Sequence, residues 1–135
     1  MLNRAPILVA EDKTFIALDL CLAIEDAGGV VVGPVASVEE ALALLATTPV
    51  AAAILDCSLV DGDCSSVVEL LADRGAPVII QTGVALPANL AGRFPQIPVH
   101  AKPVVAASLI AQLDVLICER ERAAEAAAGA ARPRG

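Results

Sequence analysis

The chain has 135 residues, near the commonest size for one domain, and 57% of them are hydrophobic. The formal net charge of −7 argues against direct binding to nucleic acid, because an acidic surface repels the phosphate backbone. Every uninterrupted apolar run is far shorter than a bilayer span, and the first is too short for a signal peptide. We therefore expect a cytoplasmic protein.

The cysteine pattern predicts neither a zinc site nor a disulfide framework. No Cys-x-x-Cys pair occurs, and His100 is the single histidine, which we expect at the rim of a site rather than as a ligand. We interpret the cysteines as small buried residues in a reducing compartment. They are Cys21, Cys57, Cys64 and Cys118.

The first half of the chain contains two strand–helix units. A short apolar run over residues 7–10 predicts a buried strand, and apolar residues at helical spacing over 16–27 predict a helix. A second β-branched run, residues 30–32, predicts the next strand. The following helix begins with a capping box, in which the Ser37 side chain accepts from the backbone of Glu40 and the Glu40 side chain reaches back.

The second half continues the alternation. Residues 51–55 predict a third strand, and a helix with apolar positions over 67–71 follows, with Ser65 or Ser66 as its cap. Residues 77–80 predict a fourth strand.

The last third of the chain is less regular at first. Residues 84–98 hold three prolines, so at most a turn or two of helix fits there. Residues 99–101 predict a fifth strand, and a long helix with inner apolar positions over 109–117 follows. We place one folded domain at 1–121. Residues 122–135 form an Ala-rich extension that is expected to prolong the helix and then fray into disorder.

Strands alternating with helices predict an α/β fold with a parallel sheet covered on both faces. Right-handed crossovers leave few topologies. We expect a flavodoxin-like (βα)5 three-layer sandwich with strand order 2-1-3-4-5 and a reduced fourth helix. No second domain is indicated, so no output domain is expected.

Polar residues follow the predicted strands at their carboxyl ends, where this fold binds ligands. Glu11 and Asp12 follow the first strand, Asp56 ends the third, Thr82 ends the fourth and Lys102 follows the fifth. Three carboxylates in one pocket repel one another, so without a counter-ion at least one is expected to keep its proton. Mg²⁺ prefers such oxygen ligands. Asp56 is the candidate nucleophile, with Lys102 and Thr82 placed to contact the oxygens of a phosphoryl group.

This ordered set, together with the Asp61-Gly62 turn and Lys102-Pro103, resembles the receiver domains of two-component response regulators over roughly residues 6–118. The resemblance implies a phosphoprotein of the phosphorelay type and not an enzyme, beyond self-phosphorylation and autodephosphorylation. It implies that Asp12 and Asp56 coordinate Mg²⁺ with the backbone carbonyl of Ser58, and that Glu11 acts mainly through water.

The resemblance also implies partners. A sensor histidine kinase or a histidine phosphotransfer protein would supply the phosphoryl group from a phosphohistidine. The phosphorylated form would then contact a downstream protein, with no direct role for nucleic acid or membrane. An exposed apolar face around the fourth and fifth elements would support a homodimer.

Two positions depart from the usual receiver pattern. Val99 stands where the family carries an aromatic switch residue, and Val104 replaces the usual Phe after Lys-Pro. Thr82-Gly83 and the short fourth helix resemble a subgroup named for a Phe-Ala-Thr-Gly motif. The departures leave a second hypothesis open, a phosphate-independent interaction module that keeps the fold. A third, a small hydrolase with Asp56 as nucleophile, lacks a second catalytic acid placed near that residue.

Overall fold

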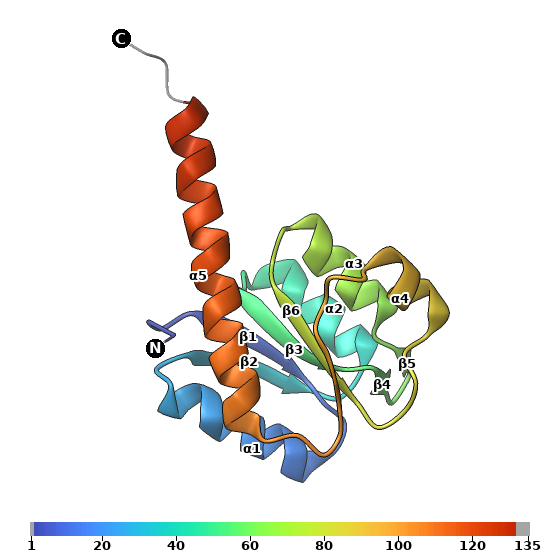
Figure 1. The fold of residues 1–135 in the computed structure, drawn as a ribbon. Helices are drawn as coiled ribbons and strands as arrows, with labels where there is room; N and C mark the ends of the chain where they lie inside the picture. The colour runs from blue at the N-terminus through green and yellow to red at the C-terminus, as the bar shows by residue number, and fades with distance from the viewer. Residues whose placement is uncertain (1, 132–135) are drawn as a thin grey trace.

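A five-stranded parallel sheet forms the centre of the computed structural model, which describes residues 2–131 (Figure 1). Its order is β2-β1-β3-β6-β7, which is the predicted 2-1-3-4-5 order when only the strands of this sheet are counted. The strands are β1 (Pro6–Ala10), β2 (Val30–Val35), β3 (Ala52–Asp56), β6 (Val78–Thr82) and β7 (Val99–Ala101). A separate small hairpin pairs β4 (Ser58–Leu59) with β5 (Gly62–Asp63).

Helices cover both faces of the sheet, so the predicted flavodoxin-like fold is confirmed. One face carries α1 (Thr14–Asp26) and α5 (Ala106–Ala131) (Figure 1). The other carries α2 (Val38–Thr47), α3 (Ser65–Asp73) and α4 (Ala88–Arg93). The six residues of α4 confirm the reduced fourth helix.

Alternating strand residues fill two separate apolar cores. In β1, Ile7 and Val9 pack on the α1/α5 side, while Leu8 and Ala10 pack on the side of α2 and α3. Glu11 lies two residues after Val9, so the same alternation points its side chain to the α1/α5 side. The sheet thereby fixes the direction in which residues at its carboxyl edge point.

Glycine permits an irregular register where β1 meets β2. The pairing shifts between Leu8 and Ala10, and opposite the shift Gly33 has a φ of 103°. A Cβ at Gly33 would lie 3.0 Å from the Val9 carbonyl oxygen, so only glycine fits without displacement. Beyond the shift, the Glu11 N–H donates to the Val35 carbonyl at 2.9 Å, which anchors the residue that follows β1.

The predicted helix caps are confirmed for α2 and wrong for α3. Ser37 Oγ accepts from the Glu40 N–H at 3.1 Å, as expected, but the Glu40 carboxylate bonds the Ser37 hydroxyl rather than its backbone. At α3, neither Ser65 nor Ser66 is the cap. The helix begins at Ser65 itself, and the Asp63 carboxylate accepts from the Ser65 N–H at 2.9 Å, because β5 brings Asp63 there.

Helix α5 continues well beyond the sheet it covers (Figure 1). Ile117 is its last buried hydrophobic residue among those with described side chains, and Arg120 still donates to the Arg74 carbonyl at 3.1 Å. The helix includes residues 122–131 of the predicted extension, whereas 132–135 lie outside the described residues. The boundary at residue 121 stays a prediction. Within residues 2–131, no helix combines the length and apolarity needed to cross a bilayer.

Candidate functional site

Four strand ends meet at one edge of the sheet. Asp56 at the end of β3 pairs in register with Gln81 of β6, and Thr82 pairs with Ala101 of β7. The Lys102 N–H donates to the Thr82 carbonyl at 2.9 Å, which draws the residue after β7 to the same edge. The topology thus gathers side chains that are distant along the chain.

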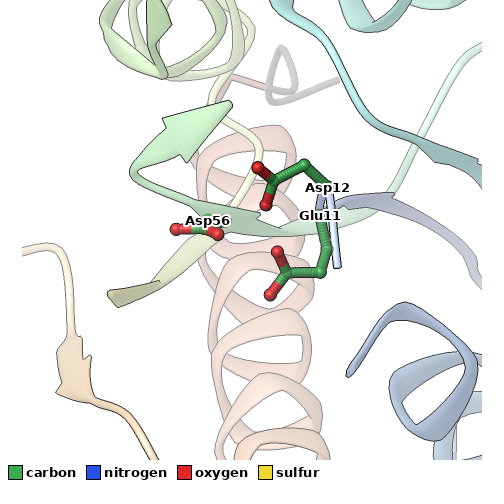
Figure 2. A group of neighbouring side chains, drawn as sticks. All are labelled: Glu11, Asp12 and Asp56. Atoms are coloured by element: carbon green, nitrogen blue, oxygen red, sulfur yellow. The ribbon is translucent and has the colours of Figure 1, made fainter. Parts of the chain in front are cut away.

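Three carboxylates form an acidic cluster, which we define as Glu11, Asp12 and Asp56. One oxygen from each residue lies within 4.8 Å of the other two. Figure 2 shows the three carboxyl groups gathered where β1 and β3 end. Glu11 and Asp56 are buried, whereas Asp12 is exposed. Three oxygen donors at this separation fit a hard divalent cation such as Mg²⁺.

The Lys102 ammonium joins two members of the acidic cluster. Its Nζ donates to Glu11 Oε1 at 2.7 Å and to Asp56 Oδ2 at 2.9 Å. The sequence predicted that lysine would approach the central aspartate, and the geometry shows this contact. The second oxygen of Asp56, Oδ1, accepts from the Ser58 N–H at 3.1 Å.

The two buried carboxyls have pKa values displaced in opposite directions. Burial raises the pKa of Glu11 to about 7, and the adjacent Asp56 adds to the rise. Burial also acts to raise the pKa of Asp56, but hydrogen bonds from Glu11, Lys102 and the Ser58 backbone outweigh it, so the pKa of Asp56 is lowered. Of the two groups, Glu11 therefore holds a proton more readily, while Asp56 stays ionised. A pKa raised by burial and by a neighbouring carboxylate is the effect expected where carboxylates gather.

Asp56 is buried beneath the side chain of Lys102. The residue is only 2% exposed, and Lys102 covers it with a side chain that is itself 13% exposed. Two buried carboxylates attract the ammonium, which accounts for its position over them. The burial of the Lys102 side chain acts to lower its pKa, but its bonds to Glu11 and Asp56 more than compensate, so the pKa of Lys102 is raised and it stays charged.

Thr82 reaches the edge but bonds elsewhere. Its hydroxyl accepts from the Val84 N–H at 3.2 Å and donates to the Val84 carbonyl at 3.1 Å. The structure therefore brings together Glu11, Asp12, Asp56 and Lys102, with Thr82 on the neighbouring strand end turned to its own loop. Ser58 contributes the backbone N–H described above, and the predicted use of its carbonyl stays a prediction.

Three further residues form hydrogen bonds that the sequence patterns did not predict. Gln81, buried at 2% exposure, donates from Nε2 to Glu11 Oε1 at 3.4 Å; its position as the polar residue next to Thr82 was the available signal. Asp61 accepts from the backbone N–H groups of Val38 and Glu39 at 2.7 and 3.1 Å, so it caps α2 across 22 residues of sequence, which no local pattern reveals. His100 is half-buried, with Nε2 bonded to Gln112 Oε1 at 2.6 Å.

The cysteines are buried as predicted with one exception. Cys118 lies on the outer side of α5 and is exposed, because its neighbour Ile117 takes the inward position. Cys57 follows Asp56 directly, and burial raises the pKa of its thiol, which disfavours the reactive thiolate.

Solved structures resemble this chain over most of its length. A response regulator receiver protein from Sinorhizobium medicae WSM419 is 25% identical, covers 89% of the chain and is itself covered over 99%, with a TM-score of 0.77. SdrG from Sphingomonas melonis Fr1 is 30% identical, with 87% and 99% covered and a TM-score of 0.72. A CheY-like receiver domain from Methanospirillum hungatei JF-1 shares the fold at 24% identity and a TM-score of 0.78, with 87% and 97% covered.

No protein-family model and no curated protein sequence matches the chain. The structural relatives nevertheless share the fold of this chain over most of its length. The acidic cluster and the structural relatives lead to the same assignment, and the chain belongs to the receiver-domain family of response regulators.

Proposed function

We propose that the chain accepts a phosphoryl group on Asp56 from a phosphohistidine and signals through contacts with other proteins. The observation that carries the proposal is the contact of Lys102 Nζ with Asp56 Oδ2 at 2.9 Å inside the acidic cluster. An ionised nucleophile, a nearby cation and a group of metal ligands are the parts that phosphoryl transfer needs.

The transfer balances without further reactants. A carboxylate oxygen of Asp56 attacks phosphorus, an O–P bond forms, and the N–P bond of the phosphohistidine breaks. The imidazole leaves with the electron pair of that bond, and a proton from solvent keeps it neutral. Bound Mg²⁺ would be held by Asp12 and Asp56, with Glu11 beside it, and would offset the negative charge of the phosphoryl oxygens.

Lys102 has two tasks in this account. In the unphosphorylated chain, its ammonium lies on Asp56 and helps to keep the carboxylate ionised at neutral pH. Since it also covers Asp56, the ammonium must move aside as the phosphoryl group enters, and it then pairs with a phosphoryl oxygen.

A surface for the phosphohistidine donor lies beside the site. We define the α1 ridge as Phe15, Leu18 and Leu22, which are 87%, 53% and 52% exposed. Their spacing places them along one side of α1, and Phe15 shares a pocket with Lys102. A donor protein must bring its histidine to Asp56, so it must cover this rim, and the apolar ridge gives it surface to bury.

The output side is expected around the segments that adjoin Thr82 and Lys102. Val84, Val99 and Val105 are large exposed hydrophobic residues there. Val84 holds the Thr82 hydroxyl through its backbone, so a Thr82 hydroxyl that turned to the phosphoryl group would release that loop. This coupling between the phosphoryl group and the loop after Thr82 does not require an aromatic residue at position 99.

Incubation with acetyl phosphate and Mg²⁺, followed by intact mass measurement, tests the proposal. We expect wild type to gain the mass of one phosphoryl group and Asp56→Asn to gain none. Equal adducts on both proteins would contradict the assignment of Asp56. An unmodified wild type would favour the phosphate-independent module, and repeated turnover of a phosphate ester would favour the hydrolase.

A further inference from the structure

Gln81 is a polar residue in a position that packing alone would give to an apolar one. It is 2% exposed and lies two residues after Ile79, which belongs to the apolar core between the sheet and helices α1 and α5. By the alternation of β6, Gln81 points to that same side, in register with Asp56. Burying an amide costs free energy unless its hydrogen-bonding groups find partners.

The partner of Gln81 is a member of the acidic cluster. Its Nε2 donates to Glu11 Oε1 at 3.4 Å, and the same oxygen accepts from Lys102 Nζ at 2.7 Å. The other oxygen, Oε2, accepts from the Lys13 N–H at 3.2 Å. The Glu11 carboxyl is thus held by three donors from three separate segments of the chain.

These donors respond differently when the site binds a divalent cation and accepts a phosphoryl group. Lys102 carries its charge on a flexible side chain. Under the proposed function, its ammonium leaves Glu11 and Asp56 as the phosphoryl group enters. The amide of Gln81 is neutral and belongs to a strand in the middle of the sheet, so a divalent cation does not repel it. Gln81 is the side-chain donor that can hold Glu11 throughout the cycle.

We infer that Gln81 is a positioning residue, which holds the Glu11 carboxyl in the acidic cluster and so sets the affinity of the site for a divalent cation. The inference rests on the proposed function in one respect, that the acidic cluster binds Mg²⁺. Mutating a group that hydrogen-bonds to a metal ligand commonly weakens metal binding by tenfold or more.

Gln81→Met tests the inference, because methionine has a similar length and volume but no donor. Mg²⁺ binding is measured by titration of the ¹⁵N–¹H NMR spectrum, and thermal stability is measured in the presence of a chelator. We expect binding about tenfold weaker than in wild type, with the fold retained. Ile79→Met is the matched control, a buried change on the same face of the same strand that removes no hydrogen bond, and it should leave Mg²⁺ affinity unchanged.

A double-mutant cycle separates positioning from simple packing. If Gln81 acts through Glu11, then Gln81→Met has no further effect on Mg²⁺ affinity once Glu11→Ala is present. An equal loss in both backgrounds, or wild-type affinity in Gln81→Met, would overturn the inference while leaving the proposed function intact. A wild-type spectrum that does not respond to Mg²⁺ would overturn both.

Discussion

At the scale of single residues, a bound metal ion and the Lys102 ammonium would compete for the same few carboxylate oxygens. Lys102 contacts oxygens of Glu11 and Asp56 that also belong to the group suited to a metal ion. A bound divalent cation and the ammonium therefore oppose each other, and the phosphoryl group is the anion that can satisfy both. This competition makes metal binding and phosphoryl transfer separable by mutation.

Lys102→Met should bind Mg²⁺ more tightly than wild type and accept phosphoryl groups more slowly. Removing the ammonium frees carboxylate oxygens for the metal but takes away a charge from the transition state, a loss of about a hundredfold in rate. Mg²⁺ titration and the rate of labelling by acetyl phosphate measure the two effects. Lys13→Met, which changes an exposed lysine beside the site, is the control. Weaker Mg²⁺ binding in Lys102→Met would be the wrong sign for this account.

The raised pKa of Glu11 predicts a pH dependence of stability in metal-free protein. Between the ordinary value of 4.5 and about 7, the folded chain binds more protons than the unfolded chain, so stability falls as pH rises through this window. The lowered pKa of Asp56 acts at more acidic pH, where stability is lost as pH falls through its folded value. Thermal melts across the window should show the decline in wild type and a flatter profile in Glu11→Gln. A profile in Glu11→Gln as steep as that of wild type would show that another group titrates.

At the scale of elements, local sequence patterns predicted the five strands of the central sheet, their order and the short α4, but not the β4–β5 hairpin. They predicted which residues gather at the carboxyl edge because parallel strands all end there. They did not predict the partners of Asp61 or Gln81, since both bonds join segments far apart in the chain. The depth of Asp56 also escaped prediction, because it depends on where Lys102 lies in three dimensions.

Helix α1 provides a prediction about donor recognition. Phe15→Ala removes the most exposed member of the α1 ridge, so stability should be unchanged. Transfer from a phosphorylated donor protein should slow by about tenfold, in the range of an interface anchor, while labelling by acetyl phosphate keeps its wild-type rate. Val115→Ala, on the exposed side of α5, is the matched control. A matching loss with the small donor would place Phe15 in the chemistry instead of the interface.

At the scale of the whole molecule, the two apolar cores and the site are complete well before the chain ends. The inner residues of α5 run from Ala106 to Ile117, and the contact of Arg120 with the Arg74 carbonyl follows. The remaining described side chains of α5, through residue 129, are exposed. The long final helix therefore supports the fold with its first half.

Truncation after Glu121 tests the proposed domain boundary. The shortened chain should keep its Tm and its rate of labelling by acetyl phosphate, since no buried side chain among those described is removed. Truncation after Gln112 should abolish the cooperative transition, because it deletes the fully buried Leu113 and the inner Ile117. A large drop in Tm for the longer form would move the boundary into the Ala-rich segment.

The central claim is that Asp56 becomes an acyl phosphate, and borohydride reduction tests it most directly. Reduction of an aspartyl phosphate gives homoserine at the modified position, which peptide mass mapping locates. The account predicts homoserine in place of Asp56 in protein treated with acetyl phosphate and Mg²⁺, and unmodified Asp56 when Mg²⁺ is chelated. Homoserine at any other acidic residue, with Asp56 intact, would contradict it.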